Sequence, residues 1–238
     1  MSKAGFAGFT APVPKGAVVL DIETAGCDFD SLDELSKEYL LKYAENPQQQ
    51  QELKESLSFY PLTAQVVAIG LAESKSDQNI VIYQDLSGVG APIKEGEVFF
   101  VPAKNENNLL KLFWSKLKEY RQIITFNGRG FDCPFLMIRS AINEVKPTLN
   151  LMPNRYSSDV HVDLLDRLTF YGSMRKRFNL HMWCKAFNIN SPKEGEVTGD
   201  QVMDLFKEGK YLDIARYCLN DIIATKRLYD YWEKYLNI

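Results

Sequence analysis

Cysteine and histidine are scarce in this chain of 238 residues. The four cysteines are scattered and form no Cys-x-x-Cys pair, so the sequence indicates neither a zinc site nor a disulfide framework. The two histidines, His161 and His181, stand far apart, and we interpret them as structural or surface residues. Scattered cysteines are typical of a reducing compartment, and we therefore expect a cytoplasmic protein.

Long hydrophobic runs and an excess of positive charge are missing as well. No apolar stretch reaches about 18 residues, the length that indicates a membrane span, and residues 1–16 lack the apolar core of a signal peptide. We therefore expect no membrane association. The net charge of −3 means that the surface as a whole does not attract nucleic acid. A nuclease is not excluded, because a carboxylate site attracts phosphate once it is loaded with metal.

The patterns that are present predict one α/β domain at residues 16–238, preceded by a flexible arm at residues 1–15. Short apolar runs rich in β-branched residues predict strands over 17–23, 65–74, 79–86, 97–103 and 122–128. Helical spacing of apolar residues predicts helices over 105–120, 131–142, 179–188, 198–209 and 210–236. Residues 159–170 are expected to begin extended and then become helical, and a helical insertion with a solvated face is expected at about 28–60. This order predicts a mixed central sheet flanked by helices, with a helical C-terminal half.

The first chemical signal is a pair of acids at the end of the strand predicted for 17–23. Asp21 and Glu23 are two residues apart, so in a strand their side chains face the same side. Two carboxylates this close repel each other unless a cation lies between them. Taken alone, Asp-x-Glu is a common pattern, and two solvated acids at an exposed strand end are the simpler interpretation.

Two further signals lie later in the chain. Asp132 opens the helix predicted for 131–142, where an acid also stabilises the helix dipole by about 0.3–1 kcal/mol. Tyr217 and Asp221 are four residues apart in a predicted helix and therefore project from one face, although a half-buried Tyr beside a solvated Asp is an equally ordinary pattern. Together the four acids are a sufficient set of oxygen ligands for hard divalent cations, and two such cations stabilise phosphoryl displacement.

The segments VVLDIET (18–24), NGRGFDCPF (127–135) and YCLND (217–221) resemble, in this order, the three exonuclease motifs of the DEDD superfamily. The third segment has Tyr four residues before its last Asp, and Arg five before it, which is the pattern of the tyrosine (DEDDy) subtype. The second segment is similar to the proofreading exonuclease domain of family-B DNA polymerases. The resemblance covers about residues 17–235 and implies a ribonuclease H-like fold. No polymerase-like sequence follows, so we expect a stand-alone 3′–5′ exonuclease.

The resemblance also implies a cofactor, a substrate and a role for each motif residue. Two divalent ions, Mg²⁺ or Mn²⁺, would be held by Asp21, Glu23, Asp132 and Asp221, with Asp132 bound partly through water. Tyr217 would orient the attacking water. The expected partner is a nucleic acid with a free 3′ end, single-stranded and more often DNA than RNA.

Secondary predictions concern substrate contacts. Thr24 and Asn127 are expected to hydrogen-bond the terminal nucleotide, and Phe131 is expected either to pack near its base or to belong to the core. Asp163 is expected to support the site or to start a helix rather than to bind metal. The basic stretch 174–178 is expected to contact phosphates or to be a solvated face.

Three rival functions remain open at this point. The chain is alternatively a non-catalytic nucleic-acid-binding module of the same fold, a different metal-dependent phosphotransferase or endonuclease, or a proofreading-type subunit that depends on a partner. The presence of all five key residues argues against the first. A preference for a free 3′ end would distinguish the predicted exonuclease from the second.

Overall fold

The computed structural model describes residues 15–88, 90–191 and 201–238. The predicted flexible arm therefore lies outside the described residues, except for Lys15, which begins the first strand. The strands are β1 (Lys15–Gly26), β2 (Ala64–Glu73), β3 (Asn79–Gln84), β4 (Ile93–Glu95), β5 (Val98–Ala103), β6 (Tyr120–Thr125) and β7 (His161–Asp163). The helices and 3₁₀ turns are η1 (Phe29–Ser31), α1 (Glu34–Leu41), α2 (Pro47–Glu55), η2 (Ser56–Phe59), α3 (Glu106–Leu117), α4 (Asp132–Ile142), α5 (Leu164–Leu168), α6 (Leu180–Ala186), α7 (Val202–Lys207) and α8 (Tyr211–Tyr235).

The strands form one seven-stranded sheet in the order β4-β5-β3-β2-β1-β6-β7. β1 pairs antiparallel with β2 and parallel with β6, and β6 pairs parallel with β7. The mixed sheet with flanking helices confirms the predicted fold class. Because β1 and β6 are parallel, the residues that follow them meet at the same edge of the sheet. The sequence analysis did not predict β4, because its three residues are all exposed and show no apolar alternation.

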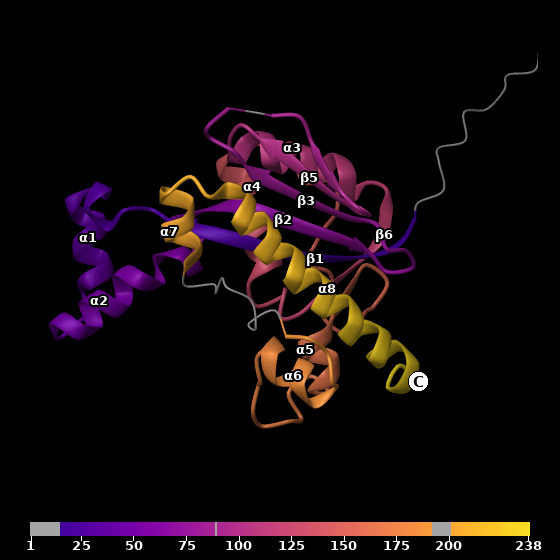
Figure 1. Cartoon of the computed structure of the whole chain (residues 1–238). Helices are drawn as coiled ribbons and strands as arrows, with labels where there is room; N and C mark the ends of the chain where they lie inside the picture. Colours follow the sequence, from indigo (N-terminus) through magenta and orange to yellow (C-terminus); the bar gives the residue numbers. More distant parts are fainter. Residues whose placement is uncertain (1–14, 89, 192–200) are drawn as a thin grey trace, which may run out of the picture.

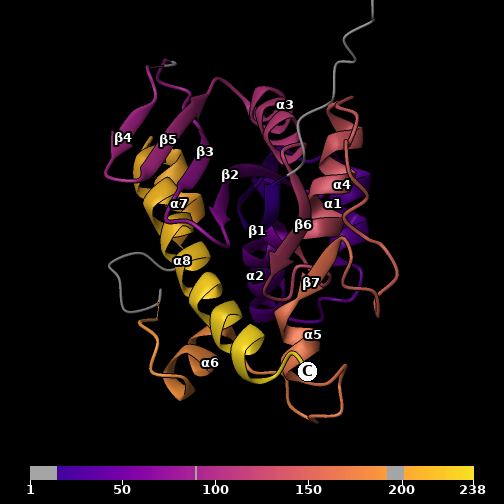
Figure 2. The same ribbon diagram turned by 90° about the vertical axis from the view of Figure 1, so that its right-hand side faces the viewer.

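Both faces of the sheet are buried. The long helix α8 crosses one face diagonally, whereas α3 and α4 cover the other (Figures 1 and 2). Along β1, Val19 and Ala25 belong to the core on the α8 side, and Leu20 and Ile22 belong to the core on the α3 and α4 side. This two-sided burial explains why β1 is an almost continuous apolar run.

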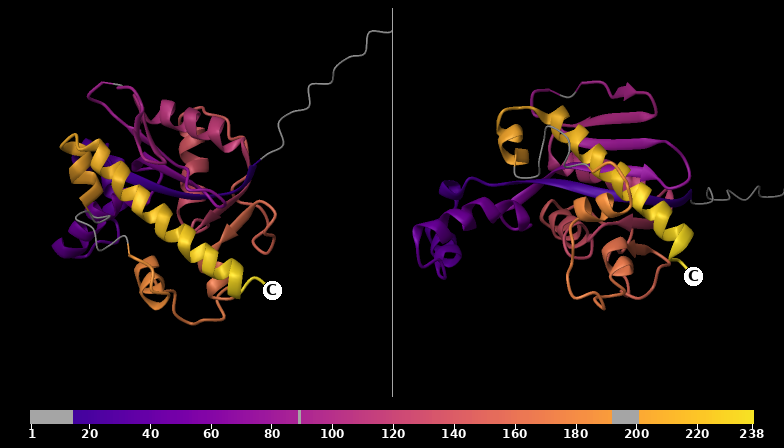
Figure 3. Two further views of the ribbon diagram at one scale, coloured as in Figure 1. Left: turned by 45° about the vertical axis from the view of Figure 1, so that its right-hand side comes forward. Right: turned by 60° about the horizontal axis from the view of Figure 1, so that its bottom comes forward.

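The residues between β1 and β2 form two short helices, α1 and α2, which are flanked by the 3₁₀ turns η1 and η2. Asp33 caps α1 by accepting a hydrogen bond from the Ser36 N–H, and Asn46 caps α2 in the same way through the Gln49 N–H. α1 and α2 extend away from the sheet (Figures 1 and 3). None of the described helices is long and apolar enough to span a lipid bilayer.

Candidate active site

The register of β1 against β2 brings Asp21 under α8. Asp21 lies directly opposite Gly70, and a Cβ atom at Gly70 would lie 2.9 Å from the Cys218 Sγ atom and 2.8 Å from the Ile222 Cγ2 atom. Only glycine therefore allows α8 to pack this closely on the sheet at that position. The close packing carries Asp221, one residue before Ile222, to the carboxyl half of β1.

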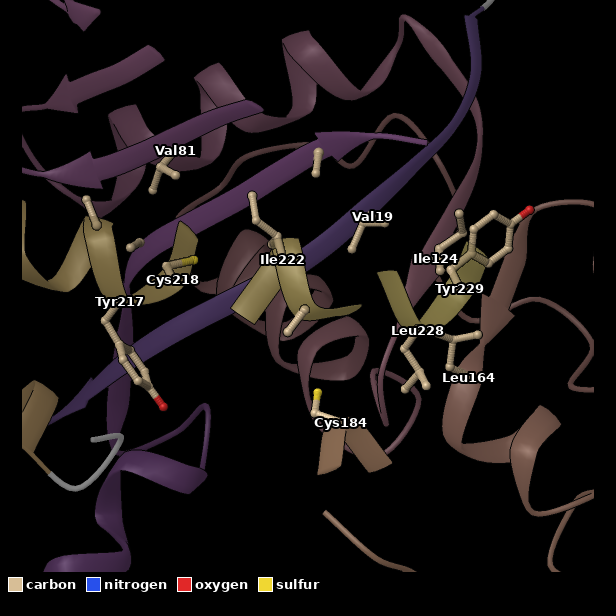
Figure 4. Packing of buried hydrophobic residues seen from close by; sticks show 14 of the residues in the cluster. Val19, Val81, Ile124, Leu164, Cys184, Tyr217, Cys218, Ile222, Leu228 and Tyr229 are labelled. Atoms are coloured by element: carbon tan, nitrogen blue, oxygen red, sulfur yellow. The ribbon is translucent and has the colours of Figure 1, made fainter. Parts of the chain in front are cut away.

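Within α8, Tyr217 and Asp221 are one turn apart and face the same place. Tyr217 is buried and Asp221 is half-buried. The Tyr217 hydroxyl lies near enough to the Asp221 carboxylate for that negative charge to raise its pKa. Tyr217, Cys218 and Ile222 belong to the core on this side of the sheet, and Tyr217 lies at one end of the cluster (Figure 4). The packing of α8 therefore determines where these two polar groups lie.

Asp132 is the first residue of α4 and is buried. The backbone N–H of Ile22, in β1, donates a hydrogen bond of 3.1 Å to its Oδ1 atom. Because the side chains of Asp21 and Glu23 lie on either side of Ile22 in sequence, this bond ties Asp132 directly to the first acidic pair. The sequence separation of 110 residues makes the contact purely tertiary.

The turn between β6 and α4 is fixed by hydrogen bonds at both ends. Asn127 has a φ of 63°, which asparagine tolerates better than most residues, and a Cβ at Gly128 would collide with the Thr125 side chain. The N–H groups of Asn127 and Arg129 donate to the two carboxylate oxygens of Asp163, at 3.0 and 2.9 Å. Asp163 also caps α5. It thus both supports the site and starts a helix, as the sequence predicted.

These elements surround a cleft of about 390 Å³. All four predicted metal-binding acids and Tyr217 line it, together with Asn127 and Phe131. Thr24 does not line the cleft. Its hydroxyl donates to the Ser58 carbonyl oxygen at 2.7 Å, and a contact of Thr24 with substrate stays a prediction. The Phe131 ring is half-buried and lies 5.4 Å from that of Phe135, so it borders both the core and the cleft.

Phe59 lines the cleft as well and was missed by the sequence analysis. It comes from η2, at the end of the segment that carries α1 and α2, and 62% of its surface is exposed. Its ring meets that of Phe131 edge-on, with the centroids 6.4 Å apart. The sequence offers no local signal for this, since Phe59 belongs to none of the three acidic motifs. An exposed aromatic ring at the mouth of the cleft is available for a planar ligand.

A second cleft, of about 450 Å³, adjoins the first and shares four lining residues with it, Asp21, Phe126, Asn127 and Asp221. Arg177 and Phe178, from the predicted basic stretch, line this second cleft. The Arg177 guanidinium also forms an ion pair with Asp166, with an N–O distance of 3.2 Å. The basic stretch therefore reaches the site through Arg177.

His161 is buried and neutral rather than a ligand. Its Nε2 atom lies 2.8 Å from the Thr125 hydroxyl, and its Nδ1 atom lies 3.0 Å from the Leu151 carbonyl oxygen. A ring that donates through Nδ1 and accepts through Nε2 satisfies both partners. Burial, followed by the positive charge of Arg129, lowers the pKa of His161 to about 4. The predicted structural role of His161 is confirmed.

The acids of the first cleft lie close enough to repel one another, which favours binding of a cation between them. Burial, followed by the charges of the neighbouring carboxylates, raises the pKa values of Asp21 and Glu23 well above their ordinary range. Burial also raises the pKa of Asp132 to about 7, against two backbone hydrogen bonds that lower it. Burial and the charge of Asp221 raise the pKa of Tyr217, so its hydroxyl stays protonated. Such a cluster must hold either protons or positive charge.

The donor set fits hard divalent cations. Carboxylate oxygens of Asp21 and Glu23 lie with the Cys218 Sγ atom within 4.8 Å of one another. Burial raises the pKa of the Cys218 thiol, so this sulfur is a neutral packing group rather than a thiolate. Oxygen ligands are the ones that Mg²⁺ and Mn²⁺ prefer, and the residues present therefore suit the ions that the sequence predicted.

Comparison with known families agrees with this geometry. Residues 58–235 match the family described as predicted 3′–5′ exonucleases related to the exonuclease domain of PolB. The chain belongs to this family. The matched range contains Asp132, Tyr217 and Asp221, whereas Asp21 and Glu23 precede it and join the site through the pairing of β1 with β2.

The fold of this PolB-related exonuclease is similar to that of a solved polymerase. The structure of the family B DNA polymerase from the hyperthermophilic archaeon Pyrobaculum calidifontis matches 95% of the chain with a TM-score of 0.58 and 18% sequence identity. The match covers 25% of that polymerase, so the chain spans about a quarter of its length. At this identity the likeness establishes the ribonuclease H-like fold. No curated protein matches the sequence.

Proposed function

We propose that the protein is a metal-dependent 3′–5′ exonuclease of the DEDDy subtype. It would remove nucleotides from the 3′ end of single-stranded nucleic acid, with DNA as the preferred substrate. One observation carries the proposal: four carboxylates and a tyrosine, from β1, α4 and α8, converge on a single cleft. DNA is favoured because the family is defined by its relation to the exonuclease domain of a DNA polymerase.

Asp21, Glu23, Asp132 and Asp221 would hold two divalent ions, Mg²⁺ or Mn²⁺. When bound, such ions make a water nucleophilic at neutral pH and offset the charge that develops on the leaving oxygen. The hydrogen bond from the Ile22 N–H to the Asp132 Oδ1 atom supports this role, because it fixes the Asp132 carboxylate beside β1.

Tyr217 would orient the attacking water rather than deprotonate it. Its raised pKa keeps the hydroxyl protonated, so the oxygen accepts from a water while its proton is donated to Asp221. The Asn127 side chain would hydrogen-bond the terminal nucleotide, and Phe131, with Phe59, would contact its base. The narrow cleft favours a frayed or single-stranded end, because the last nucleotide must leave its duplex to reach the acids.

The four cysteines all lie among the described residues, and no disulfide joins them. This state fits a reducing compartment and supports the cytoplasmic location that we propose.

A degradation assay tests the proposal. The purified chain is incubated with 5′-labelled single-stranded DNA or RNA in Mg²⁺, Mn²⁺ or a chelator. We expect a ladder that shortens from the 3′ end, and we expect it to be abolished by the chelator and by Asp21→Ala. Asp159→Asn is the matched control, because Asp159 is an exposed acid that does not line the cleft. Fragments cut internally would indicate an endonuclease instead.

The alternative is a non-catalytic binding module or a subunit that needs a partner. Binding of DNA without degradation in either metal would favour it. The raised pKa values of Asp21 and Glu23 speak for metal binding in either case, so the metal affinity does not distinguish the two.

A further inference from the structure

Helix α1 and the turn that follows it carry an apolar stripe that the described residues of this chain leave exposed. Leu35 and Tyr39 lie one turn apart on α1, and Tyr43 follows four residues later in the turn after the helix; they are 77%, 75% and 79% exposed. Residues at this spacing lie on one face of a helix. Neither α1 nor α2 has a buried residue, and both project from the sheet (Figures 1 and 3).

α1 and α2 are stabilised by their N-terminal caps and by the residues that join α2 to the sheet, here called the base of the segment. With 8 and 9 residues, α1 and α2 are too short to be stable in water by themselves. The base is fixed to the sheet, because Leu57 is buried and the Thr24 hydroxyl donates to the Ser58 carbonyl oxygen. The outer part lacks such contacts among the described residues. Clustered exposed apolar side chains of this kind mark an interaction surface.

The charge of the segment indicates the chemistry of the partner. Residues 28–60 contain eight acidic residues and three lysines, a net charge of −5, whereas the whole chain has −3. The acidic groups repel phosphates, so the two tyrosines are poorly suited to stack on nucleic acid. The acidic groups attract a positively charged surface instead. The family match begins at residue 58, C-terminal to both helices, so it assigns them no role.

We propose that residues 28–55 are a docking module for a partner protein that presents a basic, amphipathic helix. Apolar side chains of that helix would cover Leu35, Tyr39 and Tyr43. Its flanking lysines or arginines would face the exposed Glu38 and would replace Lys37 at Glu34, where the Lys37 Nζ atom now lies 3.0 Å from the Oε1 atom. Amphipathic helices commonly bind apolar stripes in this way, and complementary charge selects the partner and speeds its association.

A peptide-binding measurement on the full chain tests the proposal. The probe is a fluorescent synthetic helix with a leucine stripe flanked by lysines, and its counterpart has glutamate in place of every lysine. The test variant is Leu35→Ser/Tyr39→Ser/Tyr43→Ser. The control is Leu86→Ser/Tyr156→Ser/Tyr235→Ser, which removes the same side-chain types from positions 52%, 70% and 62% exposed. Binding is read by anisotropy without added metal, so the result does not depend on nuclease activity.

We expect the lysine peptide to bind saturably and the glutamate peptide not to bind. The test variant should weaken binding by at least about tenfold, because a few apolar anchors carry most of the energy of an interface, while the control variant should not. The thermal midpoint of the test variant should stay unchanged. No binding of the lysine peptide, or equal binding by the test variant, overturns the proposal. The proposal is also overturned if the wild type forms a dimer, or binds single-stranded DNA, and the test variant but not the control loses that property.

Discussion

Asp163 offers the most specific test of how the fold supports the site. It is buried and is not one of the four acids that we propose to bind metal, yet it holds the turn that carries Asn127 and leads to Asp132. We consider Asp163→Asn, which preserves size and shape. The variant replaces one of two acceptor oxygens by an NH₂ group, so one of the backbone N–H groups of Asn127 and Arg129 meets a donor instead of an acceptor.

The magnitude follows from those hydrogen bonds. A hydrogen bond to a charged group contributes about 1.5–3 kcal/mol, and a buried N–H left without a partner costs about 1–3 kcal/mol. These two energies describe the same contact and are therefore not added. We expect a loss of about 2–3 kcal/mol in the free energy of unfolding. For a chain of this size that lowers the thermal midpoint by about 4–12 °C. The misplaced turn should also lower kcat by about 10²-fold, as small displacements of positioned groups do.

The assay compares Asp163→Asn with the wild type and with Asp159→Asn, an exposed aspartate in the preceding loop. Thermal unfolding, Mn²⁺ affinity and the rate on single-stranded DNA are measured for each. We expect Asp163→Asn to lose stability and rate while it retains Mn²⁺ binding, and Asp159→Asn to match the wild type. A variant at position 163 that melts and cuts like the wild type would refute the role of this carboxylate. A large loss of Mn²⁺ affinity would show that Asp163 acts on the metal site itself.

Three further predictions follow from the same contacts. The pKa of Asp132 is about 7, so metal must displace protons at neutral pH. Calorimetry should show proton release on binding and an affinity for Mn²⁺ that increases as the pH rises through 7; no dependence on pH would contradict this. His161 has a folded pKa of about 4 against 6.5, so its contribution is present above pH 6.5 and is lost as the pH falls towards 4. At about 1.4 kcal/mol per pH unit, the stability difference between wild type and His161→Gln in denaturant titrations should therefore shrink by about 3 kcal/mol over that window. Gly70→Ala should cost about 1–3 kcal/mol by pressing on Cys218, whereas Gly16→Ala, which meets nothing within 4 Å, should be neutral in the same denaturant assay.

Much of the sheet and of the site was predictable because both depend on local periodicity. The apolar run of β1 and the helical spacing in α8 are properties of adjacent residues, so their elements could be assigned without the fold. Exposed and irregular parts were harder. The three residues of β4 pair with β5 by position alone, and nothing in their sequence distinguishes them from a loop. The Thr24 hydroxyl is engaged by Ser58, a contact that no motif signals.

The sequence by itself determined which side chains share a face. The two-residue period of a strand puts Asp21 with Glu23, and the four-residue spacing of a helix puts Tyr217 with Asp221. Only the tertiary structure decided that these pairs meet. That meeting depends on the register that sets Gly70 opposite Asp21, and register and helix packing are sums over many weak contacts between segments remote in sequence. The same holds for the hydrogen bond from Ile22 to Asp132 and for the entry of Phe59 into the cleft, because no local pattern encodes a contact between distant segments.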